Sequence, residues 1–143
     1  MTTGKRLTMV LAILTTFSAV SSEETPASEG PRARPTPEQV AWHDMEIGMF
    51  LCLAPNTWQD REYDDMSTPL DQINPEKLDT DQWVRAAKAM GAQYIVFVAK
   101  HTSGFCLWQT DTTKYGIKET PWRGGKGDVM ADLAASCRKL GVK

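Results

Sequence analysis

The fold class follows from Tyr94-Ile95-Val96-Phe97-Val98-Ala99, an uninterrupted run of β-branched, aromatic and small residues that carries no charge. Such a run is typical of a strand that is covered on both faces, as strands of parallel sheets are. It leads directly into Lys100-His101-Thr102-Ser103-Gly104-Phe105-Cys106-Leu107-Trp108. In proteins that alternate strands and helices, ligands bind at the C-terminal ends of the strands. A cation, an imidazole, hydroxyls and aromatic rings at this position predict a binding site, and such a mixture suits a sugar.

A helix and an earlier strand precede this stretch. Asp79-Thr80-Asp81-Gln82 predicts a capping box, in which the Asp79 carboxylate caps the first helical turn. Apolar residues follow at helical spacing and predict one apolar face, made of Trp83, Ala86, Ala87 and Met90. Gly91 ends the predicted helix. Further upstream, the apolar run from Glu46 to Leu53 predicts a first buried strand, which ends at the turn signal Ala54-Pro55-Asn56.

A second helix is predicted downstream, from Asp128 to the glycine at position 141. Its apolar stripe consists of Val129, Met130, Leu133, Ala134, Cys137 and Leu140. Two long irregular segments, 57–78 and 101–127, follow the two predicted strands. Loops of such length inside a compact domain are usually functional.

The predicted order is therefore strand, long loop, helix, strand, long loop, helix. Two consecutive strand–helix units without a hairpin signal imply parallel strand pairing. Long loops after strands and short turns after helices are typical of a (β/α)8 barrel. The sequence thus predicts an α/β fold, the first two βα units of a (β/α)8 TIM barrel, truncated. Two apolar strands whose edges and faces are unpaired also predict that the chain does not fold stably alone.

The N-terminus predicts export. Residues 1–22 form an expected signal peptide, with Lys5 and Arg6 before an apolar segment and small residues near its end. A membrane anchor is the alternative, but the apolar run is shorter than the roughly 20 residues that a spanning helix needs. Residues 23–36 predict a disordered linker and residues 37–143 the folded part. A secreted or periplasmic location follows from this interpretation.

Charge and cysteine content argue against several kinds of partner and binding site. The formal net charge is −2 with both signs mixed along the chain, which argues against nucleic acid or an anionic membrane surface as a partner. The cysteines are Cys52, Cys106 and Cys137, an odd number without a CxxC pair, which argues against zinc and against a disulfide framework. Their apolar contexts favour three buried thiols, with one disulfide as the alternative.

No metal or cofactor site is predicted. The acidic residues Asp64, Asp65 and Asp71 lack the spacing of a calcium-binding EF-hand loop. The glycine-rich stretch 124–127 lacks the Gly-Lys-Ser/Thr ending of a phosphate-binding loop. The sequence carries no signal of oligomeric state.

Several separated motifs occur in an order that resembles one known family. They are Met49-Phe50-Leu51, Asn56-Thr57, Asp60-Arg61-Glu62-Tyr63, Asp81-Gln82-Trp83-Val84, Ala99 to Trp108, Thr120-Pro121-Trp122 and Ala135 to Lys139. Between Trp42 and Lys143 the chain resembles the N-terminal part of the α-L-fucosidases of glycoside hydrolase family 29. The Asp-Arg-Glu-Tyr portion looks closest to the branch that acts on fucose linked 1,3 or 1,4.

The resemblance implies a retaining exo-glycosidase that removes terminal α-L-fucose from fucosylated glycans by double displacement, without a cofactor. It implies that the nucleophilic Asp lies on a later barrel strand and the acid/base carboxylate further on, so no catalytic residue is assigned in this chain. It implies a sugar-binding role for Glu62 and Tyr63, which match the family's Glu-Trp pair, and for His101, which matches the first His of a pair.

Four positions leave alternatives open. Cys52 stands where the family has a His at the end of the first strand, and Thr102 replaces the second His of the pair. Both changes weaken expected sugar contacts, so a catalytically inactive carbohydrate-binding relative or a non-functional gene remnant is the alternative function. Trp108, like Trp122, either stacks on sugar or packs beneath a loop. Trp83 is expected in the core.

Glu62 and His101 also each have a structural interpretation that requires no ligand. Glu62 lies in a run of charged residues that a solvated loop would also explain, and His101 would be acceptable as a loop residue without a ligand. Lys100 is expected to be a buried partner of a carboxylate rather than a catalytic base.

Overall fold

The computed structural model describes residues 32–143. Its elements are helix α1 (Pro37–His43), strand β1 (Gly48–Cys52), helix α2 (Thr80–Ala89), strand β2 (Tyr94–Val98) and helix α3 (Val129–Leu140). Short 3₁₀ helices at Pro55–Trp58, Leu70–Gln72, Ile117–Glu119 and Trp122–Gly125 interrupt the loops. The predicted signal peptide lies outside the described residues, and so does the predicted linker except for residues 32–36.

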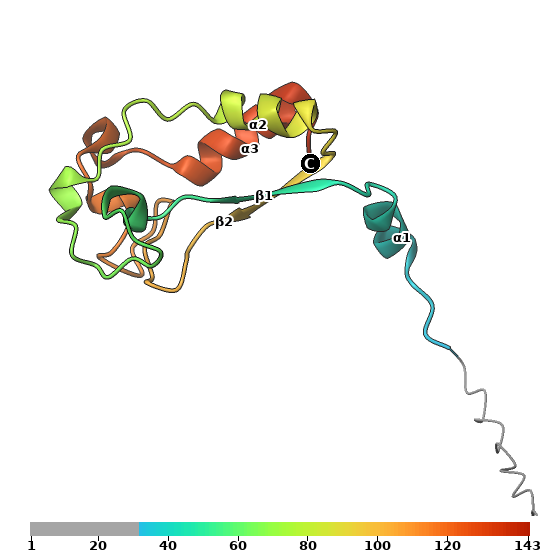
Figure 1. The fold of residues 1–143 in the computed structure, drawn as a ribbon, viewed down its shortest axis with the longest axis horizontal. Coiled ribbons are helices and arrows are strands. Elements are labelled where there is room, and N and C mark those ends of the chain that lie inside the picture. The colour runs from blue at the N-terminus through green and yellow to red at the C-terminus, as the bar shows by residue number, and fades with distance from the viewer. Residues whose placement is uncertain (1–31) are drawn as a thin grey trace, which may run out of the picture. The chain divides into compact units, whose positions relative to one another are not determined.

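Strands β1 and β2 pair in parallel, with Gly48 opposite Tyr94 and Cys52 opposite Val98. Helix α2 provides the crossover between them, as Figure 1 shows. The predicted α/β order and the parallel pairing are therefore confirmed. Beyond α3, the Lys143 amide donates to the Gln93 carbonyl and the Lys143 carbonyl accepts from the Ile95 amide. The backbone after α3 thus runs hydrogen-bonded along the free edge of β2.

Helices α2 and α3 cover one face of this sheet (Figure 1). Ile95 and Phe97 point from β2 into a cluster whose buried members are Val84, Leu133 and Val142. Trp83 stacks at a tilt on Phe97 with ring centroids 5.8 Å apart, so its expected place in the core is confirmed. A buried hydrogen bond of 2.8 Å between the Thr80 and Ser136 hydroxyls joins the two helices.

No segment of residues 32–143 covers the opposite face of the sheet. Phe50 and Val96 are partners in the strand register, and 70% and 47% of their surfaces are exposed. Residues 32–143 thus bury only one face of strands whose sequence is typical of burial on both, and the unpaired face expected for two apolar strands on their own is confirmed. Alternate residues of a strand point to opposite faces, and the two helices cover only the face that carries Ile95 and Phe97.

The ends of α2 follow the sequence signals, but its buried face differs from the predicted one. The Asp79 carboxylate accepts from the Gln82 amide at 3.0 Å, which confirms the N-terminal cap. The residues that α2 buries are Thr80, Val84 and Ala87, whereas Ala86 and Met90 are exposed. The buried face of α2 is thus turned about the helix axis by about one residue from the predicted face. The reason is that α3 packs against the side of α2 that carries the Thr80 hydroxyl.

Helix α3 also begins and ends as predicted. Asp128 caps it through a 2.8 Å hydrogen bond from the Ala131 amide, and Gly141 adopts the left-handed conformation after its last turn. Of the predicted stripe, Val129 and Leu133 are buried and Ala134 is exposed.

A second cluster of buried residues lies beneath the loops at the C-terminal ends of the strands. Its members are Ile73, Phe105, Leu107, Ile117, Trp122 and Val129. Five of these six belong to the segments between the regular elements or to their short 3₁₀ helices. The loops therefore have a core of their own, which fixes their positions.

Helix α1 was not expected from the sequence. Thr36 and Gln39 form a reciprocal capping box around Pro37 at the first helical position. This is a recognisable start signal. None of the helices in the described part of the chain is long and apolar enough to cross a membrane.

Candidate sugar-binding site

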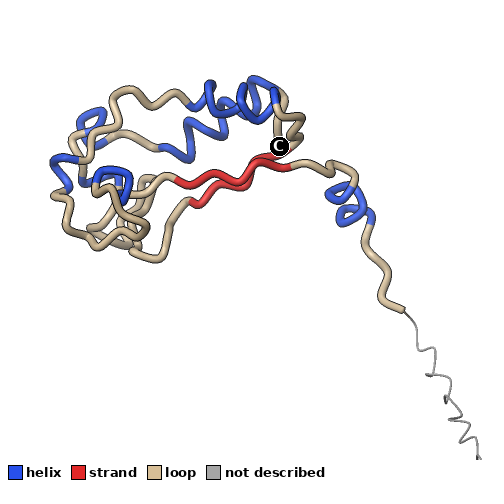
Figure 2. Tube along the Cα trace, in the orientation of Figure 1, coloured by secondary structure: helices blue, strands red, loops and turns tan. Residues whose placement is uncertain are grey.

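The two long loops leave the sheet at one end. Because β1 and β2 are parallel, the segments after Cys52 and after Val98 both begin at the same edge. Figure 2 shows these loops gathered beyond the C-terminal ends of the two strands. This is the side of a parallel sheet where ligands bind.

The first loop presents Glu62 and Tyr63 to solvent. Tyr63 is 63% exposed, and Glu62 is exposed as well. The Asn56 side-chain amide donates to the backbone carbonyls of Arg61 and Glu62 at 3.2 and 3.0 Å. Arg61 forms an ion pair with Asp65 across the base of the turn. A carboxylate and an aromatic ring are thus displayed side by side on a loop that its own side chains hold.

The second loop places His101 and Thr102 in contact. The Thr102 hydroxyl lies 3.0 Å from His101 Nδ1, with His101 half-buried and Thr102 exposed. Gly104 has a φ of +91° and its amide donates to the His101 carbonyl at 2.9 Å, which closes a tight turn. The imidazole is therefore oriented by its neighbour and held at the mouth of the loop.

The turn is anchored by buried residues that follow it. Phe105, Cys106 and Leu107 are buried, and the Leu107 amide donates to the Ala99 carbonyl at 3.0 Å. Cys106 lies between Lys100 and Gly116 through two backbone bridges. Trp108 comes next and is half-buried, so part of its ring surface remains accessible.

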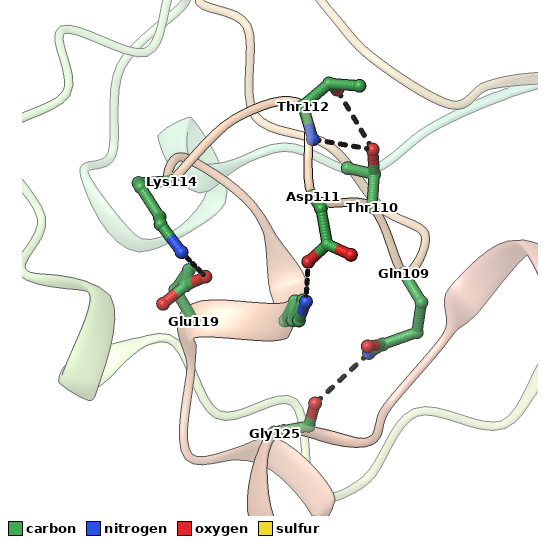
Figure 3. A network of polar contacts seen from close by, with 8 residues as sticks. Gln109, Thr110, Asp111, Thr112, Lys114, Glu119 and Gly125 are labelled. Carbon is green, nitrogen blue, oxygen red and sulfur yellow. Dashed lines mark hydrogen bonds and ion pairs between the residues drawn. The ribbon is translucent and has the colours of Figure 1, made fainter.

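A polar network holds the rest of the second loop (Figure 3). The Gln109 side chain donates to the carbonyls of Gly125 and Gly127, at 3.2 and 2.6 Å. Lys118 forms an ion pair with Asp111, and Lys114 approaches Glu119 at 3.4 Å. These contacts fold the loop back toward the start of α3.

The two loops are joined through Asp64 and Tyr115. The Tyr115 hydroxyl donates to Asp64 Oδ2 at 2.8 Å, and the Tyr115 ring meets Phe105 edge-on at 5.2 Å. Partial burial and the nearby Asp64 carboxylate raise the pKa of Tyr115 well above its usual range, so this hydroxyl stays protonated and donates. The loop that carries Tyr63 is thereby fixed to the loop that carries His101.

Asp64 is the charged centre of this junction. Partial burial acts to raise its pKa, but the nearby Ser103 hydroxyl and hydrogen bonds from the Met66 amide, Tyr115 and Gln59 outweigh burial and hold the pKa below its usual range. The Ser103 Oγ atom is buried and has no hydrogen bond of good geometry within residues 32–143. Ser103 is therefore an electrostatic neighbour of Asp64, and the three other donors are its hydrogen-bond partners.

The predicted site residues fall into two groups. Glu62 and Tyr63 are adjacent on the first loop, while His101, Thr102 and Trp108 lie on the second. The structure shows a direct contact within the second group, between His101 and Thr102. Between the groups, the connection shown in the described residues runs through Asp64 and Tyr115.

Several expectations for neighbouring residues are corrected. Lys100 is exposed and has no ion pair within residues 32–143, so it is not a buried partner of a carboxylate. All three cysteines are free, but only Cys106 is fully buried. Cys52 is exposed because the uncovered sheet face carries it. Trp122 is only 2% exposed, so it packs beneath the loop and is not available to a sugar.

The residues that hold the site together were missed. Asn56, Asp64 and Tyr115 carry no sequence periodicity, and their partners lie 2 to 51 positions away. The turn signal Ala54-Pro55-Asn56 and the Asn-Thr motif marked the position of Asn56, but neither indicates its partners. Among residues 32–143, no group of three or more His, Cys, Asp or Glu side chains is arranged to hold a metal ion.

Comparisons with known proteins give a consistent result. The family model described as Alpha-L-fucosidase matches residues 38–143. Alpha-L-fucosidase 1 of Arabidopsis thaliana is 38% identical over 108 residues, which is 76% of this chain and 21% of that protein. The crystal structure of a glycoside hydrolase 29 family member from an unknown rumen bacterium superposes with a TM-score of 0.73 at 42% identity.

That superposition covers 76% of this chain and 20% of the bacterial one. The chain therefore spans about one fifth of each of these two relatives. The matched region contains both strands and both long loops. The chain belongs to the alpha-L-fucosidase family, glycoside hydrolase family 29.

Proposed function

We propose that the protein containing this chain removes terminal α-L-fucose from fucosylated glycans. The observation that carries this proposal is the family match over residues 38–143, which includes both loops of the candidate site. The proposed roles follow from the chemistry of the side chains. Glu62 accepts hydrogen bonds from sugar hydroxyls, Tyr63 packs on the apolar face of the sugar, and the His101 imidazole bonds a further hydroxyl. Trp108 adds accessible ring surface beside them.

The proposed mechanism is retaining double displacement, in which one carboxylate attacks the anomeric carbon and a second acts as acid and then as base. We assign the nucleophile to an Asp on a later barrel strand and the acid/base to a carboxylate further on, and the two βα units here to the start of a (β/α)8 barrel. This stretch then contributes binding and orientation of the sugar. No cofactor is required by such chemistry.

The test is hydrolysis of 4-nitrophenyl α-L-fucoside by the full protein, with the released sugar followed by NMR. Initial release of the α anomer supports the retaining mechanism, and release of the β anomer would contradict it. The matched control is 4-nitrophenyl β-D-galactoside, which should not be cleaved. An absence of turnover together with measurable binding of L-fucose would support the second candidate function.

That second candidate is a carbohydrate-binding relative without activity, and two residues favour it. Cys52 is exposed at the end of β1, and the Thr102 hydroxyl occupies the space beside the His101 imidazole. If these residues have removed sugar contacts, Cys52→His together with Thr102→His should raise fucose affinity. Thr112→His on the exposed part of the second loop is the control, and an equal gain in both variants would argue against the idea.

We also propose export, with residues 1–22 as the signal peptide, residues 23–36 as a linker and a secreted or periplasmic location. The support is the basic and apolar pattern of the N-terminus. N-terminal sequencing of the mature protein should give a start close to Glu23. An intact Met1 would contradict the proposal.

A further inference from the structure

The tip of the first loop, residues 61–63, is held by the side chain of Asn56. The Asn56 amide nitrogen donates to two successive carbonyls, those of Arg61 and Glu62. Asn56 itself is fixed because it lies in the 3₁₀ helix Pro55–Trp58, directly after β1, where Pro55 is buried. The position of Glu62 relative to the sheet is therefore set by a chain of short, rigid connections.

The far side of the tip is braced by two carboxylates. Asp64 Oδ1 accepts from the Gln59 side chain and from the Met66 amide, both at 2.8 Å. Asp65 Oδ1 accepts from the Ser67 amide at 3.0 Å. A loop with hydrogen bonds on both sides of its tip loses little conformational freedom when it binds a ligand.

The backbone of this loop also carries strain. Asp60 and Met66, which flank the tip, have positive φ values of 52° and 60°. Non-glycine residues adopt this region at an energetic cost, and they persist there when surrounding contacts hold them. The bonds from Asn56 and to Asp64 are such contacts, and strained loops of this kind concentrate at ligand sites.

We propose that Asn56 is a positioning residue for the Glu62–Tyr63 pair, which it holds in the geometry that binds the terminal sugar. The identity of the ligand in this inference rests on the proposed function. The bracing of the loop by Asn56 does not depend on it. Asn56 does not touch the sugar. It acts through the carbonyls of the two peptide units that connect Arg61 to Glu62 and Glu62 to Tyr63.

Limited proteolysis with trypsin measures this bracing directly. Trypsin cleaves the Arg61–Glu62 bond, and the Arg61 carbonyl of that bond is one of the two that accept from Asn56. Cleavage there in the native protein requires the tip to open, so its rate reports local stability. Lys77, which is exposed in the same long segment, provides an internal reference for general unfolding. Asn56→Ala should raise cleavage at Arg61 about tenfold relative to Lys77, the loss expected for hydrogen bonds of this kind.

Two variants sharpen the test. Asn56→Asp has the same shape but an ionised carboxylate donates no hydrogen bond, so it should loosen the tip at least as much as Asn56→Ala. Asn74→Ala is the matched control, since the Asn74 side chain donates to Glu76 outside the tip, and it should leave cleavage at Arg61 unchanged. An unchanged rate in both Asn56 variants, or an equal rise at Arg61 and Lys77, would overturn the inference.

The sugar readout separates this inference from the proposed function. Saturating L-fucose should slow cleavage at Arg61 in the unaltered protein, and Asn56→Ala should weaken that protection, with a fucose Kd about tenfold higher. If Asn56→Ala loosens the tip but fucose affinity stays the same, the positioning role is refuted. If fucose never protects while the variants still loosen the tip, the proposed function fails and the bracing by Asn56 stands.

Discussion

At the scale of single residues, Asp64 organises a loop without an ion pair to any residue in the described part of the chain. Its hydrogen-bond partners are the Gln59 amide, the Met66 backbone amide and the Tyr115 hydroxyl. All of these donors favour the ionised carboxylate, which is why its pKa stays low despite partial burial. The cluster is therefore sensitive to acid and stable near neutral pH.

The pH dependence of this cluster follows from the sign of the shift. The pKa of folded Asp64 lies below the ordinary value of 3.8, so its stabilising contribution is complete above 3.8 and is lost as the pH falls through the lower folded value. Hydrogen exchange of the Met66 amide, corrected for its intrinsic pH dependence, should therefore accelerate in that acid range. In Asp64→Asn this acceleration should disappear, and its persistence would point to another titrating group.

Tyr115→Phe removes only the hydroxyl that bonds Asp64 and leaves the ring contact with Phe105 in place. We expect the free energy of unfolding to fall by about 1–2 kcal/mol, since a bond to a charged acceptor is lost. Urea denaturation measures this change. Tyr94→Phe is the control, because the Tyr94 hydroxyl makes no hydrogen bond within residues 32–143, and a similar loss there would argue against a specific role.

The residue scale is also where sequence reasoning was least reliable. His101 and Glu62 were correctly predicted to lie on the loops that follow the strands, because the ends of the hydrophobic runs mark where the strands end. Burial of Lys100 and Cys52 was predicted wrongly, since exposure depends on which neighbours cover a side chain. Asn56 and Asp64 carry no local signal for their partners, so only the folded loop reveals them.

At the scale of elements, the entry into α3 depends on the close packing of Trp122 against Gly127. A Cβ atom added at Gly127 would lie 1.9 Å from Trp122 Cε3, and Trp122 is buried in the core beneath the loops. Arg123 lies over the same ring, with its guanidinium carbon 4.4 Å from the ring centroid. Gly127 and Arg123 therefore both lie close to the indole, and glycine at position 127 is a packing requirement.

Gly127→Ala should consequently lower the free energy of unfolding by about 2–3 kcal/mol, the cost of overpacking at a rigid neighbour. Gly124→Ala is the matched control, because a Cβ atom added at Gly124 would meet no atom within 4 Å and only the positive φ of 62° is unfavourable. It should cost about 1 kcal/mol. Chemical denaturation of both variants gives the comparison, and equal losses would show that the indole moves aside.

At the scale of the whole molecule, residues 32–143 pack on one face of the sheet and leave the other face bare. Phe50 and Val96 on the bare face contact solvent, while Phe97 on the other packs against Trp83 and the helices. Apolar surface of this kind binds hydrophobic dyes and favours association. It also limits the apolar area that the isolated chain can bury, so a broad thermal transition is expected for residues 23–143.

Substitution on the two faces should have opposite consequences. Phe50→Ser should reduce binding of the dye ANS and leave the thermal transition unchanged, because the side chain is already exposed. Phe97→Ser should broaden or abolish the transition, since it removes a ring from the packed face and leaves a cavity. A sharp cooperative transition of residues 23–143, or a large loss of stability in Phe50→Ser, would show that the bare face is covered in solution.

The order of elements, the parallel pairing, the helix caps at Asp79 and Asp128, and the loops that carry the candidate site all follow from the amino-acid sequence alone. They depend on short-range patterns of hydrophobicity, capping and glycine, which are visible without a structure. The buried face of α2, the exposed strand residues, and the way Asn56, Asp64 and Tyr115 hold the two loops emerged only from the folded chain. Those properties depend on which residues the folded chain brings into contact, and the pattern of residues around a position does not specify its partners.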